Sequence, residues 1–181
     1  MPVLVALIRA IGPETHLKMS MADLREACRT AGVPRAETYI ATGNLILETR
    51  KSGASVQRLL ETILRGFGLE REVFLRRPEE LAALVAADPF PQAAAERPAN
   101  LAVCFLAAEP SPVGVARLEQ HRGPERIALL GRELCIDYRE GITGSRLSPA
   151  VVERRLGMPA TARNWNTVRK LSVKAEAFRV A

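Results

Sequence analysis

Two short, almost uninterrupted apolar runs constrain the fold of this chain more than any other feature of its sequence. The first covers residues 2–8 and the second covers residues 101–106. Neither run has the polar alternation of a strand with one solvated face, so both are typical of strands buried on both faces. Both are far too short to cross a bilayer. We therefore predict central strands at residues 4–8 and 101–106.

The elements expected around the first run follow the order β-α-β-β-α-β, which is that of a ferredoxin-like unit. Ser20 and Asp23 form a capping box at the first helix start, and a Gly-Asn pair at residues 43–44 signals a hairpin. The predicted segments are a strand at 2–8, a loop at 10–19, a helix from Ser20 to near Gly32, strands at 37–40 and 45–48, a helix at 55–67 and a strand at 72–75.

The second apolar run begins a partly similar order of elements: a strand, a helix, two strands and a helix. Ser148 and Pro149 form a capped helix start, and Gly157 and Pro159 lie beyond the end of that helix. A final helix is expected to start near residues 164–166. The other predicted segments are a helix at 78–87, a strand at 101–106, a helix at 112–121 and a hairpin of strands at 126–130 and 133–138.

The 181 residues fit one domain, or two small domains that are tightly joined. Residues 89–100 are rich in Pro and Ala and are the best candidate for a connection, which we expect to be irregular. The predicted organisation is an α+β fold with an N-terminal half at residues 1–88 and a C-terminal half at residues 101–181.

The cysteines and the N-terminus indicate a cytoplasmic protein. The three cysteines, Cys28, Cys104 and Cys135, are odd in number and far apart, which argues against a disulfide framework and for a reducing compartment. The first residues lack the features of a signal peptide, and no membrane partner is expected. All three cysteines lie in apolar patterns, so thiol catalysis is disfavoured.

Charge is concentrated at the C-terminal end. Residues 139–181 carry nine basic and three acidic side chains, a surplus equal to the net charge of +6 for the whole chain. Such a region can attract anionic partners, although it can equally be a solvated face. Nucleic acid is a disfavoured partner, because aromatic residues make up only 4% of the chain and no RNA-binding motif is present.

Metal and cofactor chemistry find little support. The only histidines are His16 and His121, neither is within helical reach of the other, and no cysteine pair has zinc-finger spacing. No nucleotide-binding fingerprint is present either. We therefore expect no metal and no cofactor.

The best constellation of chemistry-bearing residues lies near the C-terminus. A loop with two glycines leads into the helix start at Ser148, and a second helix starts shortly after. Helix starts attract anions, and guanidinium groups bind phosphate or carboxylate; the structural alternative is that the polar residues only cap helices. The predicted anion-binding residues are Ser145, Arg146, Arg163, Asn164, Asn166 and Lys170, with Arg9 and His16 as weaker candidates.

Five segments form a further pattern, at residues 5–9, 19–25, 39–44, 141–147 and 163–168. This pattern resembles the domain-of-unknown-function 1697 family. The resemblance implies an α+β fold of two intertwined ferredoxin-like halves, with extra C-terminal helices and mixed or antiparallel sheets. It implies no activity, because the family has none assigned. The loop after Arg9 departs from the family's glycine-rich pattern, and its Pro13 offers no N–H to a ligand.

Three functions follow as hypotheses. The first is a protein that binds a small anionic ligand, or an acidic partner, through its basic C-terminal region. The second is an enzyme of unknown reaction, with a cleft between Arg9 or His16 and the distal arginines. The third is a protein–protein interaction module. A cleft that gathers these residues would favour a site, and an exposed apolar patch with scattered arginines would favour an interaction surface.

Overall fold

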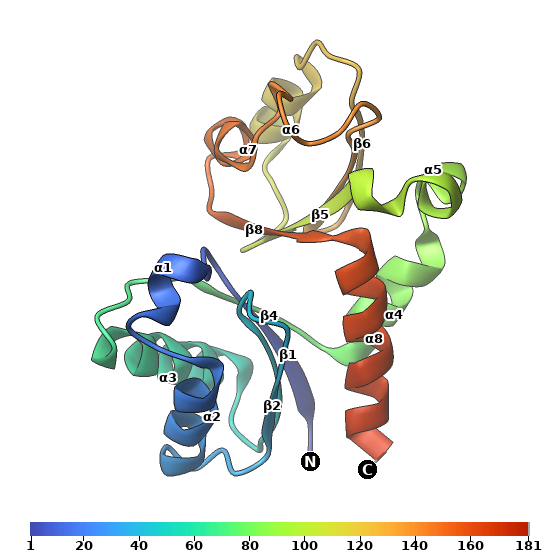
Figure 1. The fold of residues 1–181 in the computed structure, drawn as a ribbon. Coiled ribbons are helices and arrows are strands. Elements are labelled where there is room, and N and C mark those ends of the chain that lie inside the picture. Colours follow the sequence, from blue (N-terminus) through green and yellow to red (C-terminus); the bar gives the residue numbers. More distant parts are fainter. Residues whose placement is uncertain (181) are drawn as a thin grey trace. The chain divides into compact units, whose positions relative to one another are not determined.

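The computed structural model describes residues 1–180 and divides into two compact units (Figure 1). Unit 1 comprises residues 1–82 and the chain from Leu171 onward, and unit 2 comprises residues 83–170. Two helices, α4 (Pro78–Ala87) and α8 (Trp165–Val180), contribute residues to both units. The expected halves, 1–88 and 101–181, thus differ from these units, most clearly in the C-terminal helix.

Unit 1 contains one four-stranded antiparallel sheet in the order β2-β3-β1-β4. Helices α2 and α3 pack against one face of this sheet (Figure 1). Ala6, Ile8, Leu45 and Leu47 supply apolar side chains from the sheet to that core. The elements of unit 1 are β1 (Val3–Ile8), α1 (Pro13–His16), α2 (Met21–Thr30), β2 (Ala36–Tyr39), β3 (Asn44–Glu48), α3 (Gly53–Gly66) and β4 (Val73–Arg76).

Unit 2 contains a second four-stranded antiparallel sheet, in the order β6-β7-β5-β8. Helices α6 and α7 pack side by side, and Leu118, Val152 and Leu156 join the core formed with Cys104 and Ile136 of the sheet. The elements of unit 2 are α5 (Pro91–Glu96), a 3₁₀ turn (Pro98–Asn100), β5 (Leu101–Leu106), α6 (Pro112–Glu119), β6 (Arg126–Leu130), β7 (Glu133–Asp137), α7 (Pro149–Leu156) and β8 (Ala160–Asn164).

The two apolar runs are central strands, as predicted. β1 lies between β3 and β4, and β5 lies between β7 and β8. All six residues of β5 are buried, and only Leu4 of β1 is partly exposed. An edge strand would leave one row of backbone groups unpaired, so strands this apolar are placed where both edges are hydrogen-bonded. The α+β class and the antiparallel sheets are confirmed.

Three sequence-based expectations about local structure are wrong. Residues 10–19 contain the short helix α1, which Gly12 and Thr15 cap by reciprocal hydrogen bonds. The connection expected to be irregular contains α5 and a 3₁₀ turn. Pro91 is the first residue of α5, where its missing N–H has no helical partner to lose, so this proline starts a helix.

The third correction concerns β8, a strand that the sequence pattern did not reveal. Ala160–Asn164 is short and carries few large apolar side chains, so local propensity gives little signal for a strand. Its extended form comes from pairing with β5, in a register that sets Ala160 opposite Leu106 and Asn164 opposite Ala102. The final helix therefore starts at Trp165, directly after a strand.

None of the helices within residues 1–180 combines the length and the apolar character needed to cross a membrane.

Candidate functional site

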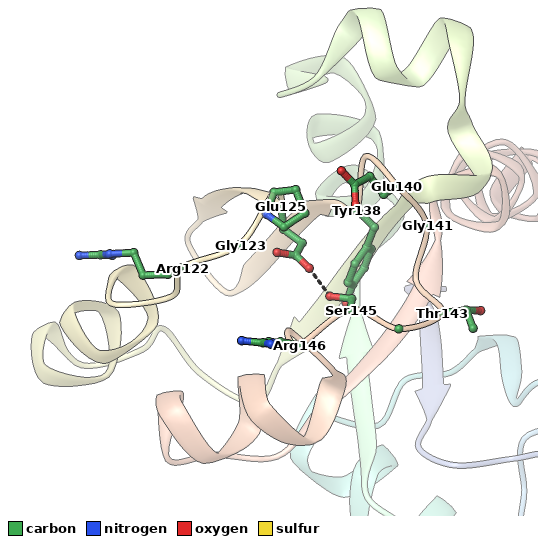
Figure 2. A pocket seen from close by; sticks show the side chains of 11 residues that line it. Arg122, Gly123, Glu125, Tyr138, Glu140, Gly141, Thr143, Ser145 and Arg146 are labelled. Atoms are coloured by element: carbon green, nitrogen blue, oxygen red, sulfur yellow. Dashed lines mark hydrogen bonds between the residues drawn. The ribbon is translucent and has the colours of Figure 1, made fainter.

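The β6–β7 hairpin of unit 2 builds a polar pocket. Its register pairs Arg126, the first residue of β6, with Asp137, the last residue of β7. The segment that enters β6 and the segment that leaves β7 therefore start from neighbouring positions. These two segments line a pocket of about 410 Å³ with residues 122–125, 138, 140, 141 and 143–146 (Figure 2). This volume is within the range of small-molecule sites.

A buried chain of three side chains joins the two segments beside the pocket. The carboxylate of Glu125 accepts a hydrogen bond from Ser145 Oγ at one oxygen, and its other oxygen lies 2.7 Å from His121 Nε2. The side chains of His121 and Glu125 are only 7% and 3% exposed. Burial opposes ionisation of Glu125, but hydrogen bonds from His121, Ser145 and the backbone outweigh it and lower the pKa of this carboxyl. Glu125 is therefore ionised at neutral pH and already matched by its own neighbours.

Gly123 makes this His–Glu contact possible. A Cβ atom at this position would lie 2.2 Å from Glu125 Oε2 and 2.6 Å from His121 Nε2. Both distances are shorter than any real contact, so a side chain here would push the pair apart.

The loop that leaves β7 is held by hydrogen bonds at several points. Tyr138 is buried and donates its hydroxyl proton to the carbonyl of Leu147, 2.9 Å away. Leu147 N–H in turn donates to Ser145 Oγ at 3.0 Å. Gly141 and Gly144 have positive φ angles of 104° and 85°, which L side chains rarely adopt. These bonds and turns hold Ser145 with its hydroxyl toward Glu125.

Two arginines of the pocket wall lack an acidic partner. Within the described chain, the side chain of Arg146 makes no hydrogen bond or ion pair, and Arg122 donates only to the backbone carbonyls of Glu119 and His121. Both residues are exposed. In Figure 2 their guanidinium groups lie on the same side of Glu125. Neither guanidinium group is therefore paired with a carboxylate within residues 1–180.

A second buried carboxylate anchors the base of the hairpin. Asp137 is fully buried and accepts hydrogen bonds from Arg97 at 2.8 Å and from Arg126 at 2.7 Å and 3.1 Å. Burial alone would raise its pKa, but these two guanidinium groups and the backbone N–H of Arg139 lower the pKa of Asp137. This network fixes the hairpin end from which both pocket segments depart.

The pocket gathers only part of the residue set predicted from the sequence. Ser145 and Arg146 line it, whereas Arg163, Asn164, Asn166 and Lys170 do not. These four lie at the end of β8 and in the first turns of α8.

Arg163 and Asn164 have hydrogen-bond partners within the chain. Arg163 is buried in β8 and donates to Thr161 Oγ1 and to the carbonyl of Ala162, both at 2.8 Å. Burial lowers the pKa of this guanidinium to about 10. Asn164 Oδ1 accepts the backbone N–H of Asn166 at 2.9 Å, so Asn164 caps the start of α8. The capping alternative considered above therefore describes this asparagine.

The weaker candidates, Arg9 and His16, belong to unit 1. Arg9 contacts the Glu72 carboxylate at 3.2 Å, and His16 Nε2 donates to the carbonyl of Ala41 at 2.7 Å. A cleft between these residues and the distal arginines would need side chains from both units, because Arg146 and Arg163 belong to unit 2.

The cysteines and the acidic groups give no further centre. All three cysteines are buried, and burial raises the pKa of Cys28 to about 11 and of Cys104 and Cys135 to about 12. The protonated thiol is a poor nucleophile, so these side chains behave as small apolar groups at neutral pH. Across residues 1–180, no cluster of three or more His, Cys, Asp or Glu side chains could hold a metal ion.

The fold and the pocket define an α+β protein with two four-stranded antiparallel sheets and a polar, arginine-flanked cavity in its second unit. The chain belongs to the family described as "Protein of unknown function (DUF1697)", whose model matches residues 1–134. The family resemblance found in the sequence is thereby confirmed. The match ends before the glycine loop of the pocket begins.

A solved structure has the same fold. It is described as that of the conserved bacterial protein SP0830 from Streptococcus pneumoniae, and it is similar to this chain with a TM-score of 0.69 and 22% identity. The similarity covers 97% of this chain and 99% of the other. No curated protein matches the chain.

Proposed function

We propose that this protein binds a small anionic ligand in the pocket beside the β6–β7 hairpin, with Arg122 and Arg146 as the groups that neutralise the ligand's charge. The main support for this proposal is that both arginines line the pocket and that neither contacts a carboxylate within residues 1–180. Guanidinium groups form strong, charge-assisted hydrogen bonds with phosphate and carboxylate oxygens. These two side chains therefore complement an anionic group of a ligand.

The carboxylate of Glu125 does not cancel this attraction. It accepts hydrogen bonds on both of its oxygens from within the protein and is nearly excluded from solvent. The negative charge of Glu125 is therefore largely compensated by its hydrogen bonds with His121 and Ser145, and its repulsion of an anionic ligand is weak. Ser145 also lines the pocket, but it donates its hydroxyl proton to Glu125, so the donors for an anion are the two guanidinium groups.

The proposed site is narrower than the set expected from the sequence. It keeps Ser145 and Arg146 and adds Arg122, which precedes β6. We infer structural roles for Arg163 and Asn164, because their polar groups are engaged within unit 2. The enzyme and the interaction module stay as hypotheses, since no contact described above favours either.

Two finer expectations about the whole chain also remain proposals. Each unit contains the order β-α-β-β-α-β, and both sheets have equivalent strand orders, which supports two ferredoxin-like units. The return of the chain from unit 2 to unit 1 in α8 supports their being intertwined. A cytoplasmic location is supported by three cysteines that are all free and buried.

Titration calorimetry with inorganic phosphate at low ionic strength tests the proposed function. Replacing Arg122 or Arg146 by glutamine should weaken phosphate binding by about 1.5 kcal/mol each, roughly tenfold in Kd, because each change removes a hydrogen bond to a charged group. Arg154→Gln is the matched control. Arg154 is an exposed arginine of α7 that does not line the pocket.

The control variant should bind phosphate like the unmodified protein. If Arg122→Gln, Arg146→Gln and Arg154→Gln all lower the affinity equally, the effect is one of net charge and the proposed site is wrong.

A further inference from the structure

A third unmatched charge lines the same pocket, and it is negative. The side chain of Glu140 makes no hydrogen bond or ion pair with any described residue. It is exposed, and it follows Tyr138 and Arg139 at the end of β7. In Figure 2, Glu140 lies on the other side of Glu125 from the guanidinium groups of Arg122 and Arg146. The pocket is therefore polarised, with positive charge at one side and negative charge at the other.

This arrangement selects against a ligand that is only an anion. Such a ligand would satisfy the arginines but would leave the Glu140 carboxylate unmatched beside it, and like charges in one site repel. A ligand with a positive group opposite its anionic group satisfies both sides. The net charge of the free wall groups, two arginines and one glutamate, also leaves an affinity for a ligand with more negative than positive charge.

We propose that the ligand is a small zwitterion, whose anionic group binds Arg122 and Arg146 and whose ammonium group lies at Glu140. This inference rests on the proposed function and adds the chemical class of the ligand. A pocket of about 410 Å³ accommodates a molecule with both groups on a short carbon skeleton. Glu140 is thus a specificity-determining residue, and the arginines supply the affinity for the anionic end.

The test compares two probes that differ only by an amine: O-phosphoethanolamine and ethyl phosphate. Calorimetric titrations at pH 7 and low ionic strength should give a two- to fivefold lower Kd for phosphoethanolamine, the gain expected of an exposed ion pair. Glu140→Gln should abolish this preference and leave ethyl phosphate binding equal or slightly tighter. Glu109→Gln, which removes an exposed carboxylate of unit 2 outside the pocket, should keep the preference.

The outcomes separate the two proposals. Equal affinity for both probes, or a preference that survives Glu140→Gln, overturns the zwitterion inference while leaving the anion site intact. Absence of binding by either probe overturns the anion site itself, and the zwitterion inference with it. A preference for phosphoethanolamine that disappears in Glu140→Gln alone supports both.

Discussion

Gly123 leaves the space in which two polar side chains meet beside the pocket. Its missing side chain lets His121 approach Glu125, and that pair in turn holds Ser145. The sequence does not reveal this role, because a glycine in a loop is ordinarily interpreted as a residue that allows an unusual backbone conformation. The reason for glycine here is space, and that becomes visible only when the neighbouring side chains are placed.

Gly123→Ala should therefore destabilise the protein by about 1–3 kcal/mol, the cost of leaving a buried polar group without its partner. Urea unfolding measures this change. Gly66→Ala is the control, because a Cβ at Gly66, the last residue of α3, meets no atom within 4 Å; it should keep or raise the stability. Equal stability of Gly123→Ala and the unmodified protein would show that the His121–Glu125 contact contributes nothing.

Asp137 gives a prediction about pH at the same scale. Its pKa in the folded protein is below its ordinary value of 3.8, so the unfolded chain binds the proton more readily. The stabilisation is then fully present above about pH 4 and is lost as the pH falls through the folded-state value.

Asp137→Asn should cost about 1.5–3 kcal/mol near pH 7, because it removes the charged acceptor of hydrogen bonds from two partly exposed guanidinium groups. The difference from the unmodified protein should shrink as the pH is lowered toward 3. Denaturant unfolding at a series of pH values measures it, with Glu109→Gln as the control that gives a small, constant difference. A difference for Asp137→Asn that is independent of pH would contradict the assignment.

At the scale of elements, α7 follows the glycine loop and fixes where that loop ends. Ser148 is its N-cap and accepts the backbone N–H of Val151, and Gly157 ends the helix in a left-handed conformation at φ 70°. Both ends of α7 can be predicted from the sequence, because a helix cap depends on local residues: serine suits an N-cap, and glycine suits the left-handed backbone at the helix end.

Ser148→Ala should lower the free energy of unfolding by about 1 kcal/mol, the usual loss on removing an N-cap. Ser148→Asp should retain the stability, since aspartate accepts the same hydrogen bond and its charge favours a helix start. Guanidinium chloride unfolding of both variants checks the pair. Two variants with identical losses would mean that Ser148 contributes through packing and not through capping.

Elements stabilised by their own sequence could be predicted, and elements stabilised by distant partners could not. The central strands and the helix at Pro78–Ala87 follow from apolar runs and from a proline at the helix start. β8 depends on pairing with β5, which precedes it by more than fifty residues. No local sequence pattern therefore predicts a strand at this position. The helix α5 is not predicted, because Pro91 and the prolines on either side of α5, Pro89 and Pro98, favour an irregular chain.

The same distinction applies to the candidate site. Ser145 and Arg146 could be predicted from a glycine loop beside a helix start. Arg122 and Glu140 lie eighteen residues apart in sequence, and they meet at one pocket because the hairpin register pairs Arg126 with Asp137. The hairpin itself was predicted, so extending its register outward by a few residues is the signal that could have brought these segments together.

At the scale of the whole molecule, the chain forms two units of similar construction that differ in what they expose. Unit 2 carries the polarised pocket between the segments that flank β6 and β7. The basic residues near the C-terminus are divided between the units, because unit 2 ends at Lys170, whereas Lys174 and Arg179 belong to unit 1. The function proposed above depends on two particular arginines, Arg122 and Arg146, and not on the overall positive charge.

Nuclear magnetic resonance of the ¹⁵N-labelled 181-residue chain tests most directly whether an anion binds at the hairpin pocket. Titration with inorganic phosphate, against chloride at matched ionic strength, should shift the backbone amides of residues 122, 123, 125 and 140–146 and the side-chain Nε–H signals of Arg122 and Arg146. The amides of residues 163–170 should stay unchanged. Saturable shifts confined to residues 163–170, or no saturable shifts at all, would contradict the assignment of the site.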